Sequence, residues 1–189
     1  ESGNWQGWEG KPIEVEIYTK ARGVNLYLND KLVASKPVNE GTEYKAIIPI
    51  PYAPGTLRAV AVDANNQEQA SATLVTTDKA YTLRLTPDRK VIKADGEDLA
   101  YITLEVVDSK GRVVPDAEVE ADIDVKGAGR FLAVGSASFK DLEPTTSHHV
   151  TTYKGRALIV VRSTQKAGTT TVTAKSALKT ASTVIKQKN

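Results

Sequence analysis

The side chains that could do acid–base or metal chemistry are few in this chain. Its only histidines are His148 and His149, and it contains no cysteine. Adjacent residues on an extended chain point to opposite faces, so we do not expect the two imidazoles to bind one metal ion together. No Gly-x-Ser-x-Gly sequence accompanies them. The sequence therefore predicts no acyl-transfer site and no metal site, and no cofactor is expected.

Carboxylates recur at alternate positions in one segment, as Glu118, Glu120, Asp122 and Asp124. Glycosidases use two carboxyl groups, but these groups must face each other across a cleft, which one strand does not supply. We interpret the row as a solvated strand face opposed by Lys or Arg on neighbouring strands. Segment 95–98, Asp-Gly-Glu-Asp, lacks the spaced acids and the later glutamate of a calcium loop. Catalytic residues are therefore not predicted.

Aromatic side chains near the start of the chain are the remaining candidates for a binding site. Trp5 and Trp8 are the only tryptophans, and Tyr18 and Tyr27 follow shortly after them. Because aromatic faces stack on sugar rings, these four residues are weak carbohydrate-binding candidates. The alternative is that the two indoles pack as a plug against a preceding domain. We favour the plug because Trp seeks a large buried area.

Length and charge limit the classes of protein to which the chain can belong. A chain of 189 residues is long for one small β-sandwich and comfortable for two. The formal net charge of +2, from 25 basic and 23 acidic residues, is too balanced to predict binding to nucleic acid or to an anionic membrane. No apolar run of membrane-spanning length and no signal peptide are visible. Since the chain starts at Glu1 and contains no Met, we expect it to be cut from a longer protein whose export signal would lie elsewhere.

The first half of the chain alternates with period two. Ile13, Val15 and Ile17 face one way, which predicts a half-buried strand. Segment 24–28 repeats the pattern, and Asn29-Asp30 then predicts a hairpin because both residue types tolerate positive φ. Further strands are expected at 32–34, 44–48, 57–62 and 70–75. Prolines 49, 51 and 54 are expected in the gaps, because proline cannot donate to a strand ladder.

The second half repeats this alternation after a segment without it. Residues 76–79 carry no apolar periodicity, so we place a domain boundary there, with domains at 1–77 and 78–189. Strands are expected at 81–85, 102–106, 119–125, 156–162, 170–174 and 182–186, while 127–153 is left unassigned. No long helical period with caps appears. The predicted fold is all-β, with two tandem antiparallel Ig-like β-sandwiches.

Sequence motifs in the first domain match a known family. Residues 5–19 (WQGWEGKPIEVEIYT) resemble the opening of the C-terminal domain of many bacterial glycoside hydrolase family 2 enzymes, chiefly β-galactosidases. Residues 24–31 (VNLYLNDK) are similar to a hairpin of that domain, and residues 50–61 (IPYAPGTLRAVA) to its proline–glycine signature. Asp30 stands where this hairpin usually has Gly, a change that an αL-tolerant residue survives at modest cost.

The second domain resembles the bacterial Ig-like domains of invasin type that follow in such enzymes. The resemblance rests on residues 94–103 (ADGEDLAYIT), 107–117 (VDSKGRVVPDA), 155–162 (GRALIVVR) and 167–174 (AGTTTVTA). One departure is that residues 134–136 read Val-Gly-Ser where relatives have a Gly-Asn-Gly loop. Together the two resemblances span nearly the whole chain.

The resemblance implies a parent enzyme that hydrolyses β-galactosides or related β-glycosides with two glutamates of a TIM barrel outside this chain. This chain would be its non-catalytic C-terminal accessory region, which supports, spaces or frames the barrel. The implied partners are the catalytic and sandwich domains of the same polypeptide, with a glycan and a homodimer through the parent as further options. The implied location is periplasmic, cell-surface or secreted. The alternatives are a carbohydrate-binding module and an adhesin-like surface stalk.

Overall fold

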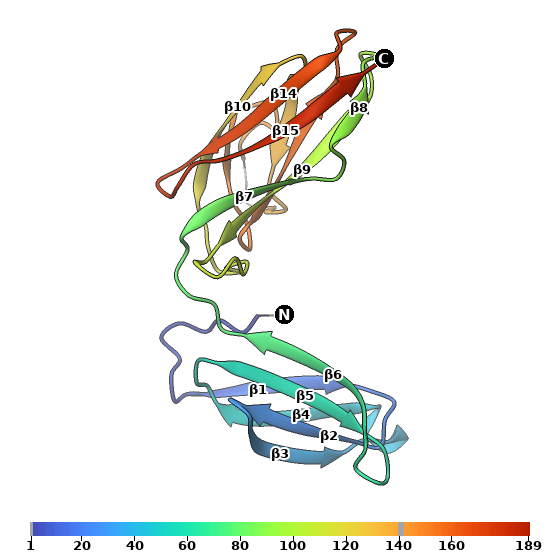
Figure 1. Ribbon diagram of the computed structural model, residues 1–189. Coiled ribbons are helices and arrows are strands. Elements are labelled where there is room, and N and C mark those ends of the chain that lie inside the picture. Colours follow the sequence, from blue (N-terminus) through green and yellow to red (C-terminus); the bar gives the residue numbers. More distant parts are fainter. Residues whose placement is uncertain (1, 140–141) are drawn as a thin grey trace. The chain divides into compact units, whose positions relative to one another are not determined.

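The computed structural model describes residues 2–139 and 142–189, and the chain divides into two compact units, residues 1–76 and 77–189 (Figure 1). The sequence placed the boundary after Thr77. The predicted all-β class is confirmed: the described residues form strands and one short 3₁₀ helix, Glu40–Thr42, but no α-helix. They include no helix with the length and apolarity that crossing a membrane requires.

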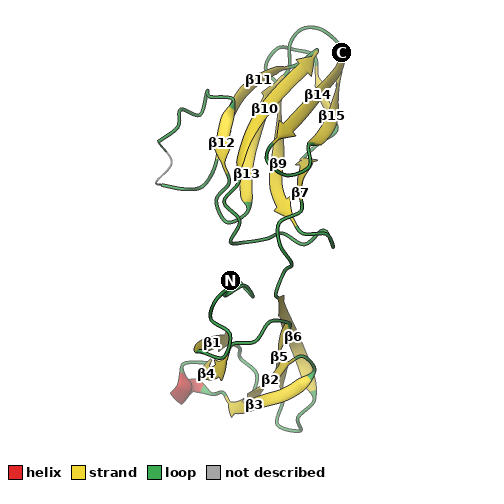
Figure 2. Cartoon of the chain, turned by 90° about the vertical axis from the view of Figure 1, so that its left-hand side faces the viewer, coloured by secondary structure: helices red, strands yellow, loops and turns green. Residues whose placement is uncertain are grey.

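The first unit is built from two sheets that enclose one core. Its strands are β1 (Pro12–Tyr18), β2 (Gly23–Leu28), β3 (Lys31–Pro37), β4 (Lys45–Pro51), β5 (Thr56–Val62) and β6 (Glu68–Val75). Strands β1 and β4 form one sheet, and the other has the order β3-β2-β5-β6 (Figure 2). Val24, Leu26 and Ile48 are buried between them. Alternate residues of β1 and β4 therefore face the core, as the period of two predicts.

The hairpin between β2 and β3 is fixed by its two turn residues. Asn29 and Asp30 have φ values of 50° and 64°, and Leu28 pairs with Lys31, so the loop has two residues. This geometry confirms the prediction of positive φ at Asn29-Asp30. The Asn29 side chain also accepts a hydrogen bond from the Thr56 N–H at 2.9 Å, which joins the turn to the start of β5.

The expectation that prolines lie only in gaps between strands is wrong for β4. Pro49 and Pro51 lie inside this strand, opposite Glu14 and Pro12 of β1. They are tolerated because β4 has a ladder on one side only, within a two-stranded sheet. On such an edge strand a residue without an N–H can face away from the ladder and no inter-strand hydrogen bond is lost.

The second unit has a larger core between sheets of five and four strands. Its strands are β7 (Thr82–Pro87), β8 (Val91–Lys93), β9 (Leu99–Val107), β10 (Glu120–Gly127), β11 (Arg130–Gly135), β12 (His149–Thr151), β13 (Arg156–Arg162), β14 (Gly168–Lys175) and β15 (Ala181–Lys188). The sheet orders are β12-β10-β14-β15-β8 and β11-β13-β9-β7. Ile102, Ile159 and Ile185 are fully buried where the two sheets face each other.

Three strands of this unit, β8, β11 and β12, escape the sequence pattern. Strands β8 and β12 have three residues each, so each buries a single side chain and shows no period. Strand β11 contains a bulge between Phe131 and Ala133, which breaks its alternation. Strand β8 also pairs parallel with β15, whereas the other strand pairs among the described residues are antiparallel.

The residues on each side of the division are hydrogen-bonded into their own unit. The Thr76 hydroxyl donates to the Gly3 carbonyl at 2.8 Å in the first unit. The Asp78 N–H donates to Oδ2 of Asp108 at 3.0 Å in the second. The two units are therefore joined by a very short segment between Thr76 and Asp78.

Candidate functional surfaces

The tryptophan pair lies in the segment before β1. The rings of Trp5 and Trp8 meet edge to face, with centroids 5.7 Å apart, and the Lys11 ammonium lies 5.4 Å from the Trp8 centroid. The backbone N–H of Trp5 donates to the Tyr52 hydroxyl at 3.3 Å. Trp5 and Trp8 are 41% and 44% exposed. Both indoles thus pack partly on the first unit and keep apolar surface that a further molecule or domain can cover.

A small cavity lies against the Trp5 side of this segment. It has a volume of about 30 Å³ and is lined mainly by apolar side chains, among them Ile13, Leu28 and Leu57. Tyr52 also lines it, and the Tyr52 hydroxyl donates to the Gly3 carbonyl at 3.2 Å. This volume is about that of one water molecule, so the cavity cannot hold a sugar.

Tyr18 and Tyr27 are not brought together with the tryptophans. Tyr18 ends β1, about 20 Å of extended strand from Pro12 at its start. Its hydroxyl donates to Glu16 at 2.6 Å, which raises the pKa of Tyr18. Tyr27 lies on β2 in the other sheet and is half-buried. The four candidate residues therefore form no single stacking surface, and their role in sugar binding stays a prediction.

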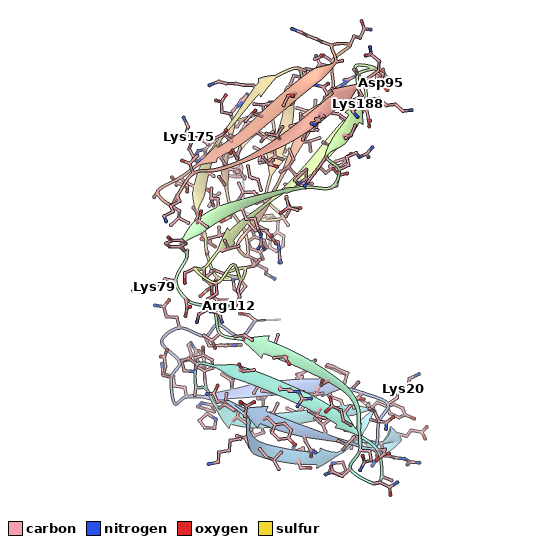
Figure 3. All side chains as sticks on the ribbon, in the orientation of Figure 1. Lys20, Lys79, Asp95, Arg112, Lys175 and Lys188 are labelled. Carbon is pink, nitrogen blue, oxygen red and sulfur yellow. The ribbon has the colours of Figure 1, made fainter. Side chains whose placement is uncertain are left out.

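The row of carboxylates lies on the outer face of the five-stranded sheet. Glu120, Asp122 and Asp124 point away from the core, since Ala121 and Ile123 between them are buried. This confirms the predicted strand and its orientation. Glu118 precedes β10 and lines, with Glu120 and Asp122, an open groove of about 650 Å³. Lys175 of β14 (Figure 3) lies opposite Asp122 in the strand register and also lines the groove.

The histidines next to this row have separate environments. Nδ1 of His149 lies 2.9 Å from Oδ1 of Asp122, and this hydrogen bond raises the pKa of His149. The His148 ring instead stacks on Phe131 with centroids 4.0 Å apart, and its Nδ1 lies 2.9 Å from the Ile123 carbonyl oxygen. The two imidazoles thus serve different contacts, in line with their opposite directions on the chain.

The acids of segment 95–98 are used by the turn itself. Hydrogen bonds from the N–H groups of Glu97 and Asp98 lower the pKa of Asp95, which also accepts from the Ser163 hydroxyl at 3.2 Å. Asp98 accepts from the Lys93 N–H at 2.8 Å. Within residues 2–139 and 142–189, no three or more His, Asp or Glu side chains converge as metal ligands.

Asp108 is the most deeply buried acid described above and serves as a structural anchor. Burial opposes its ionisation, but the N–H groups of Arg112, Lys110 and Asp78 and the Arg112 guanidinium all donate to it. The net effect lowers the pKa of Asp108 far below its usual range. The Nη2 atom of Arg112 lies 2.6 Å from Asp108 and 3.1 Å from Asp78 (Figure 3). This cluster fixes the entry of the chain into the second unit.

The outer face of the four-stranded sheet carries apolar side chains that sequence reasoning did not single out. Tyr101 on β9 faces Val160 on β13, and Val160 in turn faces Ala133 on β11. Leu158 on β13 and Leu132 in the β11 bulge flank this row. We call Tyr101, Leu132, Leu158 and Val160 the apolar patch. A signal was present, because Ala157–Val161 is an unbroken apolar run, which is typical of strands covered on both faces.

Charged side chains border the apolar patch at both ends of the strands. At one end Glu105 lies between two arginines, at 2.7 Å from Arg84 and 3.2 Å from Arg156. At the other end Arg130 pairs with Arg162 across the ladder. The Arg162 guanidinium donates to the Gly96 carbonyl at 2.7 Å and lies 3.9 Å from Glu97. The border of the patch is therefore net positive.

The chain is thus built from two all-β units. A model of the glycoside hydrolase family 2 C-terminal domain 5 matches residues 83–184, and a model of a domain of unknown function (DUF4982) matches residues 10–70. The chain belongs to the glycoside hydrolase family 2 C-terminal domain 5 family. This family's model falls on the second unit, whereas the sequence motifs suggested such a domain in the first; the invasin-type Ig-like character of the second unit stays a prediction.

Solved structures of family 2 enzymes contain the same fold. A glycosyl hydrolase family 2 member from Bacteroides cellulosilyticus is 36% identical, with a TM-score of 0.95 over 100% of this chain and 24% of that chain. A β-glucuronidase from glycoside hydrolase family 2 is 27% identical, with a TM-score of 0.88 over 98% of this chain and 19% of that one. Both units thus have counterparts in these enzymes.

The curated relatives are also much longer than this chain. The β-galactosidase BoGH2A of Bacteroides ovatus is 29% identical over 92% of this chain, which is 20% of that protein. A β-galactosidase of Thermoanaerobacter pseudethanolicus is 25% identical over 85% of this chain and 22% of that protein. The chain therefore spans about a fifth of the length of the relatives it matches.

Proposed function

We propose that this chain is the non-catalytic C-terminal accessory region of a bacterial family 2 glycoside hydrolase of β-galactosidase type. The observation that carries the proposal is the 36% identity over the whole chain to a family 2 enzyme of which it covers only 24%. In this role the two sandwiches support, space or frame a catalytic barrel that lies elsewhere in the polypeptide. The parent enzyme hydrolyses β-galactosides or related β-glycosides.

The contacts of the acidic side chains support a role without hydrolysis. A glycosidase needs two carboxyl groups about 5 to 10 Å apart across a cleft that admits the sugar. In this chain Asp95 and Asp98 cap a turn, Asp108 is buried against Arg112, and Asp122 pairs with His149 on an open sheet face. These carboxylates serve the fold.

Removal of this chain from the longer gene product tests the accessory role. The truncated enzyme should still hydrolyse a chromogenic β-galactoside, with a lower melting temperature or a changed KM. Circular dichroism and gel filtration establish that the truncated enzyme is folded. A folded, truncated enzyme whose melting temperature and KM both equal those of the intact enzyme would contradict a supporting or framing role.

A second candidate, a carbohydrate-binding module, is favoured by one observation. Trp5 and Trp8 keep about two fifths of their surface exposed on the first unit. Calorimetric titration of the chain with galactan or xyloglucan oligosaccharides separates the two candidates, since a scaffold gives no saturable heat. Saturable heat that disappears in Trp8→Ala would establish sugar binding through this pair.

The location of the parent is part of the same proposal. We place it in the periplasm, on the cell surface or outside the cell, where polymeric glycans are found. Fractionation of the producing bacterium, followed by assay of β-galactosidase activity, tests this. Activity confined to the cytoplasm would contradict it.

A further inference from the structure

The apolar patch departs from the usual outer surface of an antiparallel sandwich. Outward positions of such sheets are normally polar, because the inner face alone meets the core. Here Tyr101, Leu132 and Leu158 are 40%, 38% and 42% exposed on three paired strands, where Tyr101 faces Val160 and Leu158 lies two residues before Val160 on the same strand. Scattered apolar side chains need no explanation, whereas an apolar group with a charged border has the anatomy of a small interface.

We infer that the apolar patch is the docking surface for another domain of the same longer polypeptide, one that presents apolar side chains bordered by carboxylates. This inference rests on the proposed function, which places the chain inside a larger enzyme. It adds which face of which sheet is covered and what chemistry the covering surface has.

The size of the patch favours a covalently linked partner. Strands spaced about 4.8 Å apart and a length of about four residues of 3.4 Å on three strands give an area on the order of 200 Å². A stable complex between separate proteins buries about 800 Å² on each partner. A linked domain needs less, because the linkage raises its effective concentration to roughly the millimolar range. The relatives offer such a partner, since more than three quarters of their length lies outside the matched region.

The charges around the patch disfavour a second copy of this chain as its occupant. Arg84, Arg130, Arg156 and Arg162 border the patch, and the acids near it are Glu105, the more distant Glu97, and Asp88, which accepts from the Tyr101 N–H and pairs with Arg89. A two-fold symmetric contact places the same surface on both partners. It would bring the arginine-rich border of one copy against that of the other, and like charges at an interface are unfavourable. Carboxylates on a different domain meet the same arginines favourably.

Cysteine labelling measures directly whether the apolar patch is accessible, because the chain has no cysteine of its own. Leu158→Cys puts a thiol in the patch, and Val184→Cys puts a matched thiol on the outer face of the opposite sheet, where Val184 is 47% exposed. Maleimide labelling of each site is followed by peptide mass spectrometry, both in the 189-residue chain and in the intact gene product.

The expected result is equal labelling of the two sites in the 189-residue chain and labelling of Leu158→Cys at least ten-fold slower in the intact product, with Val184→Cys unchanged. Equal rates in the intact product would overturn the inference. Leu158→Cys could instead be labelled slowly in the 189-residue chain, with a dimer seen in sedimentation. This result would also overturn the inference, because a second copy of the chain would then cover the patch. Absence of β-galactoside hydrolysis by the intact product would instead contradict the proposed function and leave the labelling result interpretable.

Discussion

The two outer faces of the second unit are made by the same fold and differ in what they present. The outer face of the five-stranded sheet carries Asp122, Asp124 and Lys175, with His149 at its edge and Val184 as an exposed apolar side chain. The outer face of the four-stranded sheet carries the apolar patch between two charged borders. Both sheets bury their inner faces in one core, so the core does not explain this difference. We attribute the difference to what each face meets outside the unit, since the proposed docking covers only the face that carries the apolar patch.

The largest expected effect separates the two sides of strand β13. Ile159→Ala should destabilise the second unit by about 2–5 kcal/mol, because Ile159 is fully buried and its loss leaves a cavity. Leu158→Ala on the outer side should change the free energy of unfolding by no more than about 0.5 kcal/mol. Urea unfolding of the 189-residue chain measures both. Equal losses would show that Leu158 is not on the outer side and would remove the patch.

The second effect concerns the buried charge of Asp108. Asp108→Asn should cost about 1.5–3 kcal/mol at pH 7, since charged hydrogen bonds to Arg112 are lost. Because folding lowers the pKa of Asp108, its contribution is present above the ordinary Asp pKa of about 3.9 and is lost as pH falls below it. The difference between wild type and Asp108→Asn should therefore shrink between pH 7 and pH 3. An unchanged difference over this range would contradict the role given to Asp108.

The third effect concerns the charged border of the patch. Glu105→Gln should cost about 1 kcal/mol, because Glu105 holds two arginines and its side chain is only 14% exposed. The loss should diminish in 1 M salt, which screens the interaction. The matched control is Glu97→Gln, whose side chain is 85% exposed and whose nearest arginine atom is 3.9 Å away. Thermal unfolding of the two variants should rank Glu105 first; the reverse order would be evidence against the border as described.

The smallest effect is expected on the outer face of the five-stranded sheet. His149→Gln should cost no more than about 0.5 kcal/mol, since the pair with Asp122 is solvated. The hydrogen bond to Asp122 raises the pKa of His149, so any stabilisation is present below the ordinary His pKa of about 6.5 and is lost as pH rises through the raised value. Unfolding at pH 5.5 and 8.5 tests this. A larger cost at pH 8.5 would have the wrong sign.

The sequence predicted the strands with clear alternation and failed where a strand has too few residues or an irregularity. Long strands such as β9 and β13 show several buried side chains at period two, whereas β8 offers only Ile92. Prolines in β4 misled the prediction because strand position within a sheet, here an edge, is set by tertiary pairing. Proline within a strand is compatible with such an edge position, and the prediction treated it only as a strand end.

The candidate site was harder to predict than the fold. The separation of Tyr18 and Tyr27 from the tryptophans depends on which sheet each strand joins, which a one-dimensional pattern does not give. The apolar patch needs register as well, since Tyr101, Val160 and Ala133 are neighbours only through two ladders. The apolar run 157–161 was the sequence feature that indicated apolar side chains on both faces of one strand.

The most direct test of the accessory role is to assay the purified 189-residue chain and the longer gene product on a chromogenic β-galactoside. We expect turnover by the longer product and no turnover by the chain at equal molar concentration. Turnover by the chain that survives repeated chromatography and disappears when its carboxylates are replaced would contradict the claim that the two sandwiches are an accessory region.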